Sequence, residues 1–147
     1  ANHFAAVWSG SFLEHVTTPW LVAAESVRVL QVGGVALHGT PWVWPTHAAP
    51  QDFWRFSSDG LQQLFDARLG LEIISSGSVA PAVVLPSPSW RTSVLSMPTT
   101  TSASLSWIAV QKVNERVNDV VWPYDGRTNR SSPGRYPVDG LSQGPTE

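Results

Sequence analysis

The chain has 147 residues and a formal net charge of -2 at pH 7, with 42% hydrophobic and 14% charged residues and no cysteine. These values fit one domain with a sizeable core, and they exclude a largely disordered chain, disulfide bonds, thiolate metal sites and a thiol nucleophile. Because the sequence has no run of like charge and no apolar stretch of membrane-spanning length, we expect a cytoplasmic protein without nucleic-acid or membrane partners.

Residues 4 to 41 predict a strand, a helix and a second strand joined by short connections. The apolar run FAAVWSG at 4–10 is typical of a buried strand. A Thr-Pro pair at 18–19 predicts a helix start, and a Gly-Gly pair at 33–34 predicts its end. The apolar face of that helix comprises Trp20, Ala23, Ala24, Val27 and Leu30. With a second strand at 35–41, these elements form a βαβ unit, which is nearly always parallel and indicates an α/β sheet.

A second helix and a third strand follow the loop at 42–56. Ser57 predicts the cap of this helix, and Gly70 predicts its end. The apolar stripe between them comprises Leu61, Leu64, Phe65 and Leu69. Residues 71–77 then predict the third strand.

The rest of the chain carries weaker signals. Residues 78–103 are rich in proline, serine and threonine, which indicates an irregular insertion. Residues 104–113 alternate well enough for a fourth strand, although they would also suit the start of a helix. Residues 114–147 hold few apolar side chains, so we expect an extended or disordered tail after a domain at 1–113.

Five segments in chain order resemble the second half of a class I S-adenosylmethionine-dependent methyltransferase domain: VWSGSFLEHV, PWLVAAESVRVLQVGG, TPWVWPTH, PQDFWRFSSDGLQQLF and GLEIISSG. The resemblance covers residues 4–77, with a weaker match at 104–113. It implies an α/β fold: a partial Rossmann-like methyltransferase sheet with flanking helices and a long irregular C-terminal region. The family's sheet has the strand order 3-2-1-4-5-7-6 with strand seven antiparallel, and the resemblance assigns the strands of this chain as four, five, six and seven.

The same resemblance implies S-adenosylmethionine as the cofactor and a small molecule or a glycan as the methyl acceptor. The family binds its cofactor through a glycine-rich turn after strand one and an acidic residue after strand two, and this sequence contains no G-x-G-x-x-G turn. We therefore expect a fragment that lacks the N-terminal half of the domain. The alternative is a non-catalytic remnant that self-associates, as a homo-oligomer, through a sheet edge that the missing strands leave exposed.

Ligands of open α/β sheets lie beyond the carboxyl ends of the strands, and this rule selects two segments here. After the first strand, the resemblance places Ser9, Gly10, Ser11 and Glu14 beside the methionine part of the cofactor. His15 is a candidate catalytic residue, because an imidazole can take the proton of the methyl acceptor near neutral pH. The alternative is that Glu14 and His15 only brace the loop before the helix.

The second segment contains HAAPQDFWRF at 47–56. Asp52 and Arg55 are three residues apart, and their spacing predicts an ion pair that clasps the loop. The alternative is a substrate wall, in which tryptophans form an apolar slot and His47 or Arg55 orients a polar or anionic group of the substrate. The residues of such a wall are Trp42, Trp44, Trp54 and Arg55. His47 is the second candidate catalytic residue.

The sequence predicts no metal site. A zinc site formed by His3, His15, His38 and His47 is not expected, because their spacing matches no standard zinc pattern. The 8 tryptophans would also suit a sugar-binding module. Such modules are usually all-β, and the predicted βαβ unit opposes that alternative.

Overall fold

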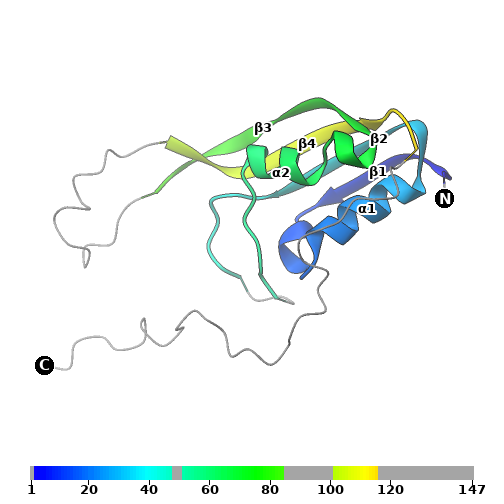
Figure 1. Ribbon diagram of the computed structural model, residues 1–147. Coiled ribbons are helices and arrows are strands. Elements are labelled where there is room, and N and C mark those ends of the chain that lie inside the picture. Colours follow the sequence, from blue (N-terminus) through cyan, green and yellow to red (C-terminus); the bar gives the residue numbers. More distant parts are fainter. Residues whose placement is uncertain (1, 48–50, 85–100, 116–147) are drawn as a thin grey trace, which may run out of the picture.

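The computed structural model describes residues 2–47, 51–84 and 101–115. Its strands form one sheet and are β1 (Phe4–Gly10), β2 (Leu30–Pro41), β3 (Leu71–Val83) and β4 (Thr101–Lys112). The strand order is β1-β2-β4-β3. β1 and β2 are parallel, whereas β4 runs antiparallel to both β2 and β3 (Figure 1). The fold is thus a mixed α/β fold, and the predicted parallel βαβ unit is confirmed.

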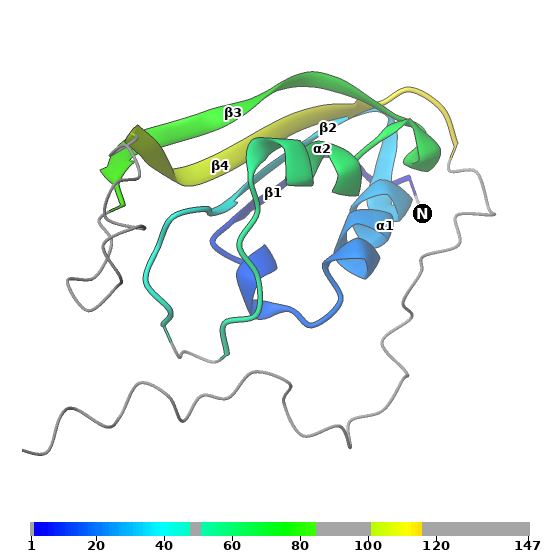
Figure 2. The same ribbon diagram turned by 60° about the vertical axis from the view of Figure 1, so that its left-hand side comes forward.

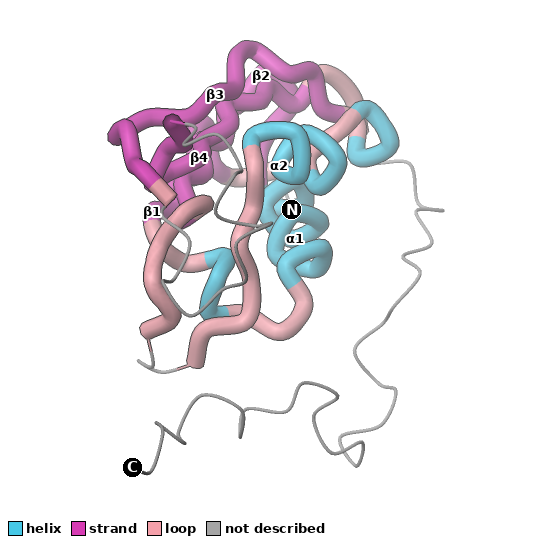
Figure 3. The backbone as a smooth tube through the Cα atoms, turned by 90° about the vertical axis from the view of Figure 1, so that its left-hand side faces the viewer, coloured by secondary structure: helices cyan, strands magenta, loops and turns pink. Residues whose placement is uncertain are grey.

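The helices α1 (Pro19–Val29) and α2 (Ser58–Leu64) lie on the same face of the sheet, as Figures 1 and 2 show. Single turns of 3-10 helix occur at η1 (Leu13–His15) and η2 (Ala67–Leu69). In Figure 3 the strands lie to one side of both helices, and no described element covers the opposite face of the sheet. No helix of the described part is long and apolar enough to cross a membrane.

The core lies between the two helices and the sheet. Alternate residues of β2 point into it, so that Ala36, His38 and Thr40 are buried while Leu37 is exposed on the opposite face. The apolar core cluster consists of Leu13, Ala23, Val27, Leu30, Ala36, Leu61, Leu64, Phe65, Leu69, Leu71, Ile108 and Val110. Each large side chain buried in this way contributes about 1.5–3 kcal/mol, and this burial holds the helical layer on the sheet.

The first helix starts where the sequence predicts and ends earlier. It begins at Pro19, whose missing N–H needs no partner in the first turn of a helix. The Thr18 side chain makes no capping hydrogen bond. The helix ends at Val29 and β2 begins at the next residue, so the predicted helix end at the glycine pair is wrong.

The glycine pair at 33–34 instead forms a bulge inside β2. Phe4 of β1 pairs with Leu30 of β2, and the next pair is Ala6 with Val35. β2 therefore has more residues than β1 between these two pairs, and the extra β2 residues are not paired with β1. The first glycine of the pair has a φ of 85°, which a residue with a Cβ rarely adopts. The backbone freedom of glycine serves a bulge as well as a helix end, and the local sequence does not distinguish the two.

The second helix begins where the sequence predicts and ends earlier. α2 ends at Leu64 and the separate 3-10 turn η2 precedes Gly70, so the predicted helix end at Gly70 is wrong. The Gly60 main-chain N–H donates to Ser57 Oγ at 3.1 Å, so Ser57 caps α2. The predicted stripe is buried in full and comprises Leu61, Leu64, Phe65 and Leu69. Gly70 follows η2 in the left-handed conformation, with a φ of 74°.

The third strand is longer than predicted. β3 continues to Val83 and β4 starts at Thr101, so both ends of the segment 78–103 are strand rather than irregular. Pro81 lies within β3, which pairs only with β4 among the described strands. An edge strand tolerates proline, because the missing N–H faces away from the ladder.

The segment 104–113 lies almost entirely in β4, so the prediction of a strand is confirmed over its helical alternative. The central part of the predicted insertion, 85–100, lies outside the described residues. The same is true of 116–147, which makes up nearly all of the predicted tail.

Candidate functional site

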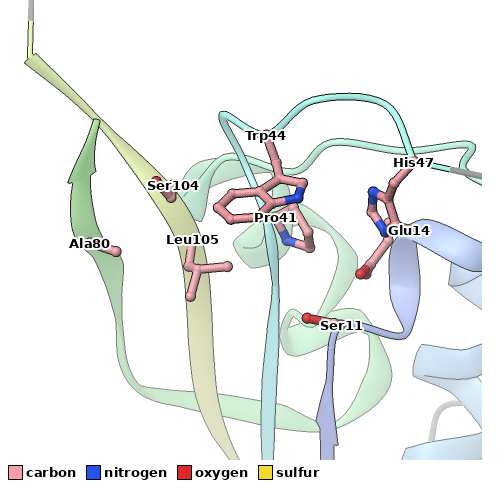
Figure 4. A pocket seen from close by; sticks show the side chains of 8 residues that line it. All are labelled: Ser11, Glu14, Pro41, Trp44, His47, Ala80, Ser104 and Leu105. Atoms are coloured by element: carbon pink, nitrogen blue, oxygen red, sulfur yellow. The ribbon is translucent and has the colours of Figure 1, made fainter. Parts of the chain in front are cut away.

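The parallel strands β1 and β2 end at the same edge of the sheet, and the loops that follow them meet there. The Ser11 N–H donates to the Gly39 carbonyl at 2.9 Å, and the Phe53 N–H donates to the Glu14 carbonyl at 2.7 Å. A cavity of about 300 Å³ opens at this rim (Figure 4). Its lining residues are Ser11, Glu14, Pro41, Trp44, His47, Ala80, Ser104 and Leu105. The two segments that follow the carboxyl ends of β1 and β2 therefore contribute to one cavity, as the sequence predicts.

Glu14 is the buried acid of this site. The 3-10 turn η1 directs its side chain inward, where it is fully buried. Its Oε2 accepts a hydrogen bond from Thr40 Oγ1 at 2.9 Å, whereas its Oε1 has no hydrogen-bond partner among the described residues. A buried polar atom without a partner is rare in folded proteins, and an ordered water or a bound ion is a common explanation for one.

Two histidines stand beside this acid. His15 Nε2 lies 3.6 Å from Glu14 Oε1, and His47 Nε2 lies 3.2 Å from His15 Nε2. The two rings meet edge to face, with centroids 4.9 Å apart. The structure thus brings both predicted catalytic histidines together, although 47–56 and the β1 loop are distant in the sequence. Figure 4 shows His47 and Glu14 on one side of the cavity and Leu105 on the other.

An ion pair fixes the loop that carries His47. The Arg55 guanidinium donates to both carboxylate oxygens of Asp52, and it also donates to the carbonyls of Trp44 at 3.2 Å and Pro45 at 3.0 Å. Asp52 Oδ2 in turn accepts from the His47 main-chain N–H at 2.8 Å. The Arg55 hydrogen bonds hold the pKa of the Asp52 carboxyl far below its usual range, so Asp52 is an anion. This geometry is the clasp that the spacing of the two residues predicts.

Beneath the rim, a third histidine, His38, is buried in the core. Ser9 Oγ lies 2.7 Å from His38 Nδ1, and the His38 ring stacks on Phe65 with centroids 4.3 Å apart. Burial lowers the pKa of His38 to about 4, so its imidazole is neutral near pH 7. Ser9 therefore bonds a core residue, whereas Gly10 ends β1 at the rim beside Ser11.

The predicted wall residues separate into two groups. Trp44 lines the cavity, as the substrate-wall alternative requires. Trp54 instead donates from Nε1 to the Val16 carbonyl at 2.8 Å and packs edge to face on Trp20. Trp42 is partly exposed beyond β2, and neither Trp42 nor Trp54 is among the residues that line the cavity.

Four contributors to the site have no counterpart in the sequence prediction. Thr40, Ala80, Ser104 and Leu105 come from β2, β3 and β4. The alternation of side chains along β2 could have identified Thr40, because every second residue of a strand points to the same face and Thr40 shares that face with Ala36 and His38. The other three depend on the pairing register of β3 and β4, which no local pattern in the sequence sets.

The uncovered face of the sheet carries a second, apolar hollow. This groove has a volume of about 470 Å³. Large apolar side chains from all four strands line it, among them Trp8, Leu37, Val79, Leu105 and Trp107. Trp8 on the edge strand β1 is 74% exposed. Such a face normally packs against another layer.

No protein-family model and no curated protein sequence matches this chain. Among solved structures, it is similar to a chain in the complex between the Haloferax volcanii Trm112 methyltransferase activator and its proposed methyltransferase, with a TM-score of 0.52 and 14% sequence identity. At this sequence identity the similarity bears on the fold alone, and it supports a partial methyltransferase-like fold for this chain. The similarity covers 79% of this chain and 57% of that chain, so the present chain spans little more than half the length of its neighbour.

The [4+2]-cyclase SpnF is also similar, with 20% sequence identity, over 54% of this chain and 31% of the cyclase. Its TM-score of 0.44 is too low to bear on the fold.

Proposed function

We propose that this chain is the acceptor-side part of an S-adenosylmethionine-dependent methyltransferase that acts on a small molecule or a glycan. In this proposal β1, β2, β3 and β4 correspond to strands four, five, six and seven of the family's sheet. The order β1-β2-β4-β3, with β4 antiparallel, supports that correspondence. The observation that carries the proposal is the convergence of Ser11, Glu14 and His47 at one cavity on the carboxyl rim, where His15 contacts His47.

When bound, S-adenosylmethionine supplies an electrophilic methyl carbon. The residues of this chain would align the acceptor within the cavity, where a hydroxyl or amine must also lose a proton as its oxygen or nitrogen attacks. His15 or His47 would take that proton on Nε2. Glu14 Oε1, at 3.6 Å from His15 Nε2, would stabilise the resulting imidazolium.

The residues present fit only one end of this cofactor. Gly10 and Ser11 leave the main chain accessible at the end of β1, which suits contact with the methionine part. The sequence holds no glycine-rich turn for the rest of the cofactor. We therefore expect this chain by itself to bind S-adenosylmethionine without saturation below millimolar concentration.

Amide chemical shifts of the isotope-labelled chain would test this proposal. Millimolar S-adenosylmethionine should shift the amides of residues 9–15, whereas adenosine alone, the matched ligand without the methionine part, should leave them unchanged. Equal effects of both ligands, or shifts confined to other residues, would refute the placement. Saturation at micromolar concentration would show that the chain contains the cofactor site that we consider missing.

A second function, self-association, is favoured by the edge strand β1. Among the described strands β1 pairs only with β2, so its outer edge offers unpaired main-chain groups. Phe4 and Trp8 are exposed on that strand, and Phe12 is exposed just after it. Light scattering at several protein concentrations would test self-association. A monodisperse monomer at all concentrations would count against it. A dimer that becomes monomeric in the Trp8→Ser variant would support it.

A further inference from the structure

Three ligand-type atoms converge at the rim site: one each from Glu14, His15 and His47, all within 4.8 Å of one another. His15 Nε2 and His47 Nε2 are 3.2 Å apart, and Glu14 Oε1 is 3.6 Å from His15 Nε2. A tetrahedral zinc ion, with ligand bonds of about 2.0–2.2 Å, places neighbouring ligand atoms roughly 3.3–3.6 Å apart. These two separations lie close to that range, and the ligand atoms of Glu14 and His47 lie within 4.8 Å of each other.

We propose that Glu14, His15 and His47 bind a divalent first-row transition-metal ion. Two imidazoles and one carboxylate suit Zn²⁺ and its neighbours in the series better than Mg²⁺ or Ca²⁺, which prefer oxygen ligands. Three protein ligands leave a coordination position open, as in metal sites that bind a water or a substrate. This inference rests on the geometry of these side chains, and it requires neither the cofactor nor the methyl acceptor of the methyltransferase proposal.

The unpaired oxygen of Glu14 is an independent observation that points to a cation. Glu14 is fully buried, and its second oxygen is already occupied by the hydrogen bond from Thr40. Its Oε1 faces the histidines without a hydrogen-bond partner in the described part of the chain. A metal ion between Glu14 Oε1 and the two imidazoles would satisfy this oxygen, since buried charges are normally paired or coordinate metals.

The Nδ1 atoms of both rings, which face away from the proposed metal position, have partners like those of metal-binding histidines. His15 Nδ1 contacts the Gln51 carbonyl, and His47 Nδ1 lies 3.3 Å from Asp52 Oδ2. A carbonyl and a carboxylate only accept hydrogen bonds, so these contacts favour the tautomer with the proton on Nδ1 of each ring and a lone pair on each Nε2. Metal-ligating histidines usually donate their other N–H to such groups, which fixes the ring.

A shared proton is the competing occupant of the two nitrogens. A proton can link His15 Nε2 to His47 Nε2, but it does not reach Glu14 Oε1, which is 3.6 Å from His15 Nε2. A metal ion would engage the three atoms together. While His15 Nε2 holds a metal it cannot accept a proton, so the metal-bound and proton-accepting states exclude each other.

The proposed site departs from the expectation of no metal site, which rested on the spacing of the histidines in the sequence. Of the histidines considered, only His15 and His47 take part, and an acid supplies the third ligand. His38 is buried in the core against Phe65, and His3 precedes β1 at the opposite end of that strand.

The test uses the purified chain after removal of bound metal with a chelator. Zn²⁺ is titrated by calorimetry, and Co²⁺ is followed by its visible absorption bands, which report the coordination geometry. We expect one equivalent of either ion. The variants Glu14→Gln, His15→Gln and His47→Gln should each weaken binding at least about tenfold, in line with the effect of losing a group that a metal site depends on. His3→Gln, an exposed histidine outside the site, is the matched control and should bind within about twofold of wild type.

Two outcomes would overturn the proposal. One is equal Zn²⁺ affinity in all variants. The other is an absence of Co²⁺ bands together with histidine NMR resonances that respond to pH and not to Zn²⁺, which would show a shared proton instead. If Glu14→Gln fails to fold by circular dichroism, His47→Gln decides the test, because its side chain is only partly buried on a loop.

Discussion

Ser9 and His38 face each other across the parallel pair β1 and β2, with Ser9 Oγ 2.7 Å from His38 Nδ1. His38 Nε2 has no hydrogen-bond partner among the described residues, and the ring is buried against Phe65. The core directly beneath the rim site therefore depends on a neutral imidazole.

His38 should make the stability of the fold pH-dependent. Burial lowers its pKa to about 4, from 6.5 in an unfolded chain. Between these values the unfolded state binds more protons, so the free energy of unfolding should fall as the pH falls from 6.5 towards 4, and His38 should add no slope above 6.5. The full effect is on the order of 3 kcal/mol.

Urea unfolding at pH 7 and at pH 4.5 measures this slope in wild type and in His38→Gln. Between pH 7 and pH 4.5, the free energy of unfolding should decrease by about 2–3 kcal/mol less in His38→Gln than in wild type. Equal losses in both proteins would show that another group controls the acid sensitivity.

The Asp52–Arg55 clasp should contribute far more to stability than a surface ion pair of the same spacing. Arg55→Ala removes the hydrogen bonds to Asp52, Trp44 and Pro45 and leaves a nearly buried carboxylate unpaired, which should cost about 1.5–3 kcal/mol in urea unfolding. The matched control is Arg28→Ala, because Arg28 and Glu25 are also three residues apart but both are exposed. That variant should lose much less stability than Arg55→Ala, because solvent screens an exposed ion pair.

Gly70 should tolerate alanine less well than Gly33, although both have positive φ values, 74° and 85°. A Cβ at Gly33 would meet nothing within 4 Å, so Gly33→Ala should cost only the left-handed backbone strain of roughly 1–2 kcal/mol. A Cβ at Gly70 would lie 2.4 Å from Asn114 Oδ1 and 2.9 Å from the Asn114 carbonyl oxygen. Gly70→Ala should therefore lose at least about 1 kcal/mol more by thermal or urea unfolding. Equal losses would argue that the contact with Asn114 is easily displaced.

Lys112 should be required for the junction between α1 and β2. Its buried ammonium donates to the carbonyls of Val27 at 3.1 Å and Leu30 at 3.0 Å and to Asn2 Oδ1 at 2.7 Å. Lys112→Met keeps the apolar stem but leaves these acceptors unsatisfied, so we expect a loss of about 2–3 kcal/mol in the free energy of unfolding.

The neighbouring variant Gln111→Met serves as the control for Lys112→Met. Gln111 is on the opposite face of β4 and donates one hydrogen bond, to the Gly33 carbonyl at 3.0 Å. The Gln111→Met variant should lose at most about 0.5–1.5 kcal/mol in the free energy of unfolding. A loss for Lys112→Met no larger than this would contradict a structural role of the ammonium.

Features that depend on neighbouring residues could be predicted from the sequence. The helix start at Pro19, the cap at Ser57 and the buried stripe of α2 follow from the chemistry of one or two turns. The short connections between β1, α1 and β2 required these strands to be parallel, so the loops after Gly10 and Pro41 had to open at one rim. The ion pair between Asp52 and Arg55 could also be predicted from the sequence, because the two residues are only three positions apart.

Features that depend on distant residues were decided only by the tertiary structure. The bulge at 33–34 requires the β1 partner, and the extension of β3 through Pro81 requires that β3 be an edge strand. The contributions of Ser104 and Leu105 to the cavity depend on the register of β4. Glu14 and His15 meet His47 because two loops fold over the same rim. Local propensities determine where elements start and which faces are apolar, but register and loop contacts are set by packing between segments that no short window of sequence contains.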